Sequence, residues 1–417
     1  MSAGVGGLGV PLMGAATAPS WRLPRATGAF LCTAILFVGL NFQMLTFSGH
    51  LAEGESGSGP ALKAYHGLFA CFGLLLLVRG RLVRWRPEMI VYFMVIGITS
   101  LLAALHFGPR ALIANTVFAA YAATLGATVG HMAGAQTAIR ALRVASVIVL
   151  SAVLVKAALN LSEIIRFLAA PDGHPLLPTF YGGGPNIEAT WVAMSGLFLI
   201  GSRLFVPYML GSAVLSVAYA SRVGLITVTL VVVAGIAGSM LRGGGGTRHY
   251  RRWLLAAAVL LLTGAGLAAA RGVTGADYIA RRFQSIGEDP GSTSRLTLWT
   301  GGAEVFAAHP FGVGLGNSVP MIERELAANI KEDNLHNLYL QHLVDTGMQG
   351  LAVFVLLAAL TWRRVLVTRF QDPMILYTGI YFVLALLQFR GAEALLWFVY
   401  GLQHGGATLR QEAYAAA

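Results

Sequence analysis

Charged residues are scarce in this chain of 417 residues, and their scarcity excludes an ordinary soluble enzyme. Only 11% of the residues are Asp, Glu, Lys or Arg, whereas 56% are hydrophobic. A soluble domain would carry roughly a quarter charged residues. The composition therefore predicts an integral membrane protein.

Cysteines and metal-binding patterns are nearly absent as well. The two cysteines, Cys32 and Cys71, both fall inside apolar runs, so they form neither a disulfide framework nor a metal motif. The sequence has no HExxH pattern and no Asp-x-Asp pair, and His342 would lie on a different helical face from His336. We therefore expect no metal site and no cofactor.

Acidic residues are outnumbered, since 18 Asp and Glu oppose 29 Lys and Arg and give a formal net charge of +11. The basic residues are scattered singly and in short clusters between apolar runs, so no nucleic-acid-binding surface is expected. We interpret the charge as a signal of membrane topology.

A helix that spans a membrane needs about 20 mostly apolar residues, and twelve segments are candidates. These segments are 29–47, 65–78, 88–106, 111–130, 144–161, 189–202, 204–220, 223–241, 253–270, 347–362, 374–389 and 393–403. A single helix over 204–241 would run roughly 57 Å, nearly twice the hydrocarbon thickness, so a tight turn is expected at Ser221-Arg222. We predict an all-α, polytopic protein in which residues 1–417 form a single membrane domain.

The distribution of Lys and Arg predicts the orientation of the chain. More than half of the 29 basic residues fall in alternate connections, as in cytoplasmic loops, which places both termini in the cytoplasm. The N-terminal segment is too polar and glycine-rich for a signal peptide. Two loops on the opposite side are long, 162–188 and 271–335, and we expect short helices in the second.

The stretch 294–351 is the richest in groups that could do chemistry. Arg295 is expected to open an amphipathic helix that stops at His309-Pro310, because a residue before proline is pushed out of helical geometry. The glycines of Gly312-x-Gly314-x-Gly316 lack the strand-to-helix context of a dinucleotide loop. They indicate either a hinge or backbone that approaches a phosphate.

Two arginines are candidates for binding an anion. Arg222 lies in an otherwise uncharged run, where arginine is costly, although a helix-end arginine can also reach to the membrane interface. Arg295 alone fits a solvated surface charge. Together, two guanidinium groups could hold a diphosphate through bidentate bonds to its oxygens.

His336 and Asn337 stand at the head of an apolar segment. An imidazole can take a proton from a hydroxyl near neutral pH, although a lone histidine at a helix end also fits a structural role. Lys156 and Glu163 lie near the outer end of the fifth predicted span. We interpret both as charges at the membrane interface and not as catalytic groups.

These motifs resemble a known family in their order along the chain. They are Ser221-Arg222, Ser294-Arg295 with Trp299, His309-Pro310-Phe311-Gly312, His336-Asn337-Leu338-Tyr339 and Gly350-Leu351. The pattern resembles the O-antigen ligase and Wzy-type polymerase superfamily of bacterial envelope enzymes. The resemblance is concentrated in residues 190–351.

The resemblance implies an all-helical GT-C-type glycosyltransferase of the bacterial inner membrane, with its active site on the periplasmic face. Such enzymes move a glycan from an undecaprenyl-diphosphate carrier to an acceptor hydroxyl without nucleotide sugar or metal, and direct displacement would invert the anomeric carbon. By this resemblance Arg222 and Arg295 hold the leaving diphosphate and His336 activates or orients the acceptor hydroxyl. Asn337 and Asn186 are further substrate-binding candidates.

The acceptor stays open at this point. A ligase would use lipid A–core oligosaccharide and a polymerase another lipid-linked repeat unit, and both branches share the same motifs. The loop 317–335 is short for this family, which leaves the acceptor side undefined. From another class, a transporter or flippase for lipid-linked glycans would use the two arginines to bind charge, but no internal repeat is evident. A structural membrane subunit would not require the polar stretch 271–335.

Overall fold

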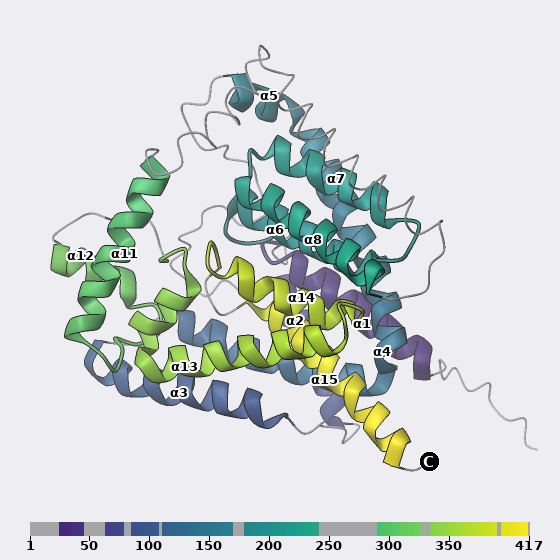
Figure 1. The fold of residues 1–417 in the computed structure, drawn as a ribbon, viewed down its shortest axis with the longest axis horizontal. Helices are drawn as coiled ribbons and strands as arrows, with labels where there is room; N and C mark the ends of the chain where they lie inside the picture. Colours follow the sequence, from purple (N-terminus) through teal and green to yellow (C-terminus); the bar gives the residue numbers. More distant parts are fainter. Residues whose placement is uncertain are drawn as a thin grey trace, which may run out of the picture.

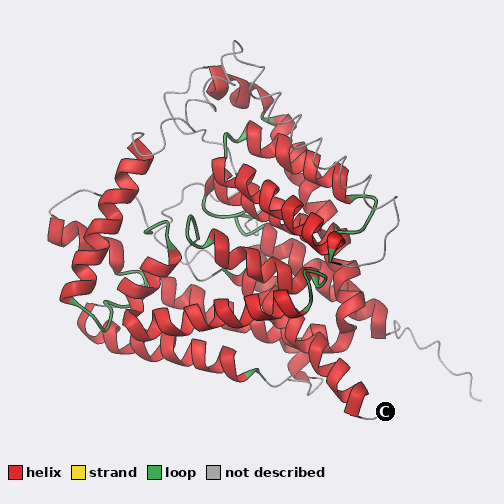
Figure 2. Ribbon diagram, viewed as in Figure 1, coloured by secondary structure: helices red, strands yellow, loops and turns green. Residues whose placement is uncertain are grey.

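The structure is a computed structural model that describes residues 25–45, 63–78, 85–107, 111–169, 179–241, 290–326, 330, 334–389 and 393–415. Every regular element in these ranges is helical, which confirms the all-α prediction (Figure 2). The helices are α1 (Arg25–Asn41), α2 (Ala64–Val78), α3 (Pro87–Phe107), α4 (Ala111–Leu159), α5 (Leu161–Ala169), α6 (Gly184–Ser195), the 3-10 helix η1 (Gly196–Leu199), α7 (Phe205–Ala218), α8 (Arg222–Met240), α11 (Pro290–Ala308), α12 (Ser318–Leu326), α13 (Leu338–Val367), α14 (Pro373–Leu384) and α15 (Ala394–Ala415).

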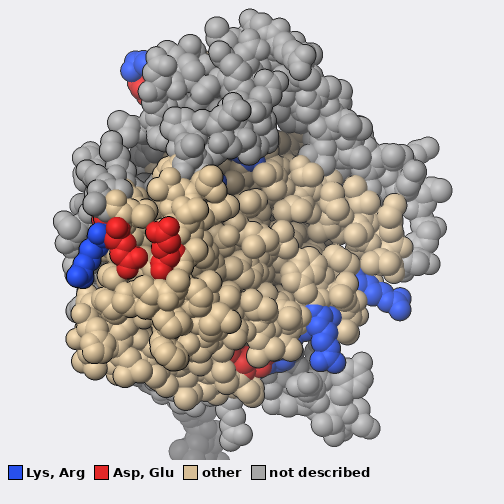
Figure 3. Space-filling model, turned by 60° about the vertical axis from the view of Figure 1, so that its left-hand side comes forward, with Lys and Arg blue, Asp and Glu red and all other residues tan. Residues whose placement is uncertain are grey.

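Four of the described helices, α3, α4, α8 and α13, are long and apolar enough to cross a membrane. Large apolar side chains such as Leu101, Leu105 and Leu159 are exposed on the surface. Figure 3 shows one face on which charged side chains are few and scattered. An uncharged surface of this kind is suited to lipid, so the chain is a membrane protein. The full set of twelve spans stays a prediction, and the predicted span 253–270 lies outside the described residues.

The segment between the fourth and fifth predicted spans is helical, contrary to the break expected over 131–143. Residues Ala111–Leu159 form one continuous assignment, α4, which leaves helical geometry only at Gly134 with φ 67° and ψ 160°. That backbone region is accessible essentially to glycine alone. A single glycine therefore separates two helical halves, each about 35 Å long and long enough to span the hydrocarbon core.

Close glycine contacts hold α4 against α15. Gly126 and Gly130 on α4 face Gly401 and Gly405 on α15, so both helices carry the G-x-x-x-G spacing that lets helix backbones approach in membranes. A methyl group added at Gly130 would lie 2.9 Å from the Cα atom of Leu402. This crossing is the most extensive helix contact among the described elements.

The two ends of α3 meet different parts of the chain. At its first turn, Glu88 accepts a hydrogen bond from Arg364 near the end of α13, at 2.5 Å. At its last residue, the Phe107 ring contacts His309, with ring centroids 5.6 Å apart. Figure 1 shows α3 and α13 running alongside each other between these ends. Arg364 is expected on the cytoplasmic side and His309 on the opposite side. The two residues contact opposite ends of α3, as this expectation requires.

A second, smaller core lies beside the bundle, and we call it the outer module. It consists of α11, α12 and the first turns of α13, at the left of Figure 1. Its buried residues are Leu298, Val305, Val313, Val319, Met321, Ile322, Leu335 and Val344. The described part of the predicted loop 271–335 is thus a packed helical unit and carries the expected short helices.

Several helix boundaries differ from the predicted spans. The helix α6 starts at Gly184 and ends at Ser195, so the predicted span 189–202 begins too late and includes η1. The helix α13 starts at Leu338, more than two turns before the predicted span 347–362, and bends at Gly347. Apolar content marks the membrane-buried part of a helix but not its polar first turns, which explains both shifts.

Candidate functional site

The predicted turn at Ser221-Arg222 is confirmed. The helix α7 ends at Ala218, and Ala220 adopts a left-handed backbone with φ 47°. Ser221 then caps α8, because its hydroxyl oxygen accepts a hydrogen bond from the Gly224 amide at 3.0 Å. Arg222 is consequently the first residue of α8, where the exposed backbone amides of a helix start add positive potential.

Asn186 lies at the start of a neighbouring helix. Gly183 and Gly184 have φ values of 100° and 83°, and α6 begins at Gly184 with Asn186 in its first turn. The starts of α6 and α8 pack together, since a methyl group at Gly224 would lie 3.0 Å from the Cβ atom of Ala189. The structure therefore brings the segments that carry Asn186 and Arg222 together.

Arg295 and His336 are the second pair of candidates, and both lie in the outer module. Arg295 does not open its helix as expected, because α11 already begins at Pro290, and proline is favoured in a first helical turn. The end of α11 at Ala308, directly before His309-Pro310, is confirmed. Arg295 shares a helix face with Trp299 one turn later, and the Trp299 indole donates a hydrogen bond to the Leu335 carbonyl at 2.7 Å.

His336 itself has an unusual backbone. Its φ is 52°, in the left-handed region that few residues other than glycine adopt, and its amide donates to the Asn334 side-chain oxygen at 2.9 Å. Asn337 caps α13 by accepting a hydrogen bond from the Leu340 amide at 3.1 Å. The position of His336 at the head of an apolar helix is thus confirmed.

The helix α14 links the two pairs. The Leu338 amide donates to the Ala385 carbonyl at 2.8 Å, just past the end of α14. One turn earlier, the ring of Tyr381 stacks on Trp191 of α6, with centroids 5.8 Å apart and planes inclined by 23°. Direct convergence of Arg222, Arg295 and His336 at one substrate stays a prediction.

The glycine run 312–316 lies along the bend of α13. The Val313 amide donates to the Val344 carbonyl at 3.0 Å and the Gly314 amide to the Asp345 carbonyl at 2.7 Å. The Gly316 amide donates to the Asp345 carboxylate at 3.1 Å. The interpretation of this run as phosphate-approaching backbone is therefore wrong, because these amides already bind acceptors in α13.

Asp345 is a structural residue that the sequence did not reveal. Its carboxylate is 1% exposed and also accepts hydrogen bonds from the Ser318 amide at 3.1 Å and from Gln341 at 3.4 Å. Ser318 is the first residue of α12, so a carboxylate on α13 caps a helix that is distant in sequence. In the sequence, Asp345 is a lone acidic residue within an apolar segment. That pattern does not indicate which residue it binds.

Replacing Gly347 by alanine is expected to destabilise the outer module by about 1–3 kcal/mol. Its backbone has φ 72° and ψ −172°, and an added methyl group would lie 2.6 Å from the Phe311 carbonyl carbon. Thermal unfolding in detergent measures the loss. Gly302→Ala is the control, because that glycine is helical and its nearest atoms would lie 3.5 Å from the methyl group. Equal melting temperatures for both variants would contradict the assigned role of this bend.

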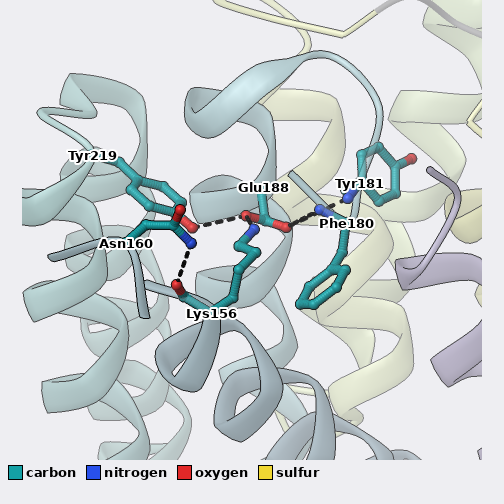
Figure 4. Close-up of polar contacts among 6 residues, drawn as sticks. All are labelled: Lys156, Asn160, Phe180, Tyr181, Glu188 and Tyr219. Atoms are coloured by element: carbon teal, nitrogen blue, oxygen red, sulfur yellow. Dashed lines mark hydrogen bonds and ion pairs between the residues drawn. The ribbon is translucent and has the colours of Figure 1, made fainter. Parts of the chain in front are cut away.

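Lys156 is not an interface charge, contrary to expectation. Its side chain is 9% exposed and forms an ion pair with Glu188 on α6, which is 2% exposed (Figure 4). Glu163, by contrast, pairs with Arg166 on the exposed surface of α5. Sequence reasoning missed the buried pair because its members are separated by a long loop, although each is a lone charge near the outer end of an apolar segment.

Residues 189–355 match a family model described as O-antigen ligase, Wzy_C. This match supports placing residues 189–355 in the O-antigen ligase and Wzy superfamily. The Wzy_C region includes Arg222, Arg295, His336 and Asn337, whereas Asn186 lies just before it. A comparison with curated proteins gave no match. A domain of this family suggests a glycosyl-transferring enzyme of O-antigen assembly that works on lipid-linked glycans in the membrane.

Proposed function

We propose that the protein is an O-antigen ligase, a GT-C-type glycosyltransferase of the bacterial inner membrane with its active site on the periplasmic face. It moves a glycan from undecaprenyl diphosphate to a hydroxyl of lipid A–core. The observation that carries this proposal is that candidate groups within the matched region lie at the polar starts of apolar helices. Arg222 begins α8, and His336 directly precedes the cap of α13.

In this proposal, positive charge at the start of α8 and on α11 binds the diphosphate of the glycan donor. Arg222 adds a full positive charge to the amides at the start of α8, and the start of α6 packs against it. Arg295 supplies a second guanidinium from α11. Two such groups can each form bidentate bonds to phosphate oxygens, and these bonds strengthen as the leaving diphosphate gains charge.

The acceptor side is organised by His336. The acceptor hydroxyl oxygen attacks the anomeric carbon of the glycan, and the bond from that carbon to the diphosphate oxygen breaks. His336 takes the hydroxyl proton, and undecaprenyl diphosphate leaves with the bonding electron pair. Attack from the face opposite the leaving group inverts the anomeric configuration, and the step requires neither nucleotide sugar nor metal.

The backbone at His336 supports a functional role for this residue. A left-handed conformation outside glycine costs free energy and persists where the surroundings impose it, often at functional sites. Here the imposing contacts are the Asn334 side chain, which accepts from the His336 amide, and the Trp299 indole, which holds the preceding carbonyl. These contacts fix the backbone of His336 next to the helix that carries Arg295.

The second candidate function is a Wzy-type polymerase that uses a lipid-linked repeat unit as acceptor. It would employ the same arginines and histidine, so the donor chemistry is common to both. A lipid-linked glycan transporter is the alternative from another class. It is disfavoured because the sequence shows no evident internal repeat of the kind on which many secondary transporters are built.

Two reactions with the purified protein test the proposal. Both contain an undecaprenyl-diphosphate-linked glycan, and one also contains lipid A–core. We expect the glycan to be joined to lipid A–core in the first reaction and no product in the second. A ladder of growing lipid-linked chains without lipid A–core would instead identify a polymerase. Passage of unaltered donor across a vesicle membrane, without product in either reaction, would identify a transporter.

A further inference from the structure

Four separate segments of the chain meet at the carboxylate of Glu188 (Figure 4). Lys156 near the end of α4 and the Tyr219 hydroxyl both bond to its Oε2 atom, the latter at 3.0 Å. The backbone amides of Phe180 and Tyr181 donate to its Oε1 atom at 2.7 and 3.4 Å. Both carboxylate oxygens are therefore fully engaged.

Lys156 is enclosed as well. Its ammonium group lies 4.6 Å from the ring centroid of Phe180 and 5.7 Å from that of Tyr219, so two aromatic faces take the place of solvent. The Asn160 amide caps the helix here by donating to the Lys156 carbonyl at 2.8 Å. The ammonium group is thus held between α4, α6 and the end of α7.

Two of these segments, the one that ends at Tyr219 and the one that contains Phe180 and Tyr181, lead directly to candidate substrate-binding residues. Tyr219 is followed by left-handed Ala220, the cap Ser221 and then Arg222. Tyr181 is followed by the glycines at 183 and 184 and then Asn186. One carboxylate therefore fixes the chain just before each of the two helix starts.

Stability alone gives a weak reason for a buried ion pair, because the cost of removing two charges from water offsets much of their attraction. We propose that Glu188, Lys156 and Tyr219 form a positioning network that sets Arg222 and Asn186 against the carrier diphosphate. This inference rests on the proposed function. None of the three residues needs to touch substrate, since they act through the backbone turns that follow them.

Tyr219→Phe tests the network with the smallest change, because it removes one hydroxyl group and preserves the ring. Tyr208→Phe is a matched control. Like Tyr219, Tyr208 is 3% exposed, and its hydroxyl donates a buried hydrogen bond to the Val192 carbonyl at 2.7 Å. It lies near the start of α7, whereas the turn that carries Arg222 follows the end of α7. The measurements are the Kd for undecaprenyl diphosphate, the KM for donor and acceptor, and the melting temperature in detergent.

We expect Tyr219→Phe to weaken undecaprenyl diphosphate binding about tenfold, the low end of the effect expected for one lost hydrogen bond to a charged group. The donor KM should rise in parallel while the acceptor KM stays unchanged, and Tyr208→Phe should alter neither. Equal losses in both variants, or an unchanged Kd for Tyr219→Phe, would overturn the inference. Absence of product and of carrier binding in the wild-type protein would instead overturn the proposed function.

A double variant separates positioning from folding. Lys156→Met leaves an unpaired buried carboxylate and should lower the melting temperature, whereas Lys156→Met with Glu188→Gln removes both charges and should recover it. Carrier affinity should stay low in the double variant, because the neutral amide binds the Tyr219 hydroxyl and the two backbone amides less strongly than the carboxylate does. Recovery of carrier affinity together with melting temperature would contradict a positioning role.

Discussion

Replacing Arg222 or Arg295 by alanine is expected to lower glycan transfer by roughly two to three orders of magnitude, the usual cost of losing a group that stabilises developing charge. Each guanidinium is assigned to the diphosphate, which gains negative charge as the glycosidic bond breaks. Lysine at either position should restore only part of the rate, because a point charge cannot form the planar bidentate pair. Initial rates with a lipid-linked glycan donor measure the effect.

Arg203→Ala is the matched control for the two arginines. Arg203 is exposed between η1 and α7, on the side predicted to be cytoplasmic. Its replacement should leave transfer unchanged, and all variants should reach the membrane in equal amounts. Wild-type rates in both Arg222→Ala and Arg295→Ala would remove the diphosphate role from the account.

His336→Asn is expected to reduce turnover by about two to three orders of magnitude while donor binding stays within about twofold. Asparagine is the informative substitution because it tolerates the left-handed backbone that His336 adopts, with φ 52°, and cannot act as a general base. Alanine at this position would combine loss of the imidazole with backbone strain. Turnover and the Kd for undecaprenyl diphosphate are measured on the same preparation.

His309→Ala provides the comparison for His336. His309 also belongs to the outer module, where it contacts the Phe107 ring and lies 3.9 Å from the Glu325 carboxylate. We expect at most a small change in turnover from this variant. Loss of donor binding in His336→Asn, instead of loss of turnover, would assign His336 to the donor and not to the acceptor hydroxyl.

Local signals made much of the candidate site predictable from the sequence. The turn at Ser221-Arg222 follows from length, since one helix over that stretch would exceed the membrane thickness. The end of α11 before His309-Pro310 follows from the restriction that proline imposes on its neighbour. The start of α13 after Asn337 matches the preference of asparagine for helix caps. Each of these features depends on a few adjacent residues.

Contacts between distant segments account for what the sequence did not reveal. The residues around Lys156 do not indicate that it pairs with Glu188. Those around Asp345 do not indicate that it binds the amide of Ser318. The connection expected over 131–143 is a bend at Gly134 within one long helix, which hydropathy did not reveal because it assigns no structure to the residues between two apolar segments. Burial and pairing across the bundle are properties of the fold, so hydrophobic periodicity alone does not determine them.

The release of carrier lipid tests the central claim most directly. Purified protein is incubated with an undecaprenyl-diphosphate-linked glycan and lipid A–core, and mass spectrometry counts both products over time. We expect one undecaprenyl diphosphate for each glycan joined to lipid A–core, and neither product from Arg222→Ala. Consumption of donor without release of undecaprenyl diphosphate, or equal product from wild type and Arg222→Ala, would contradict transfer at this site.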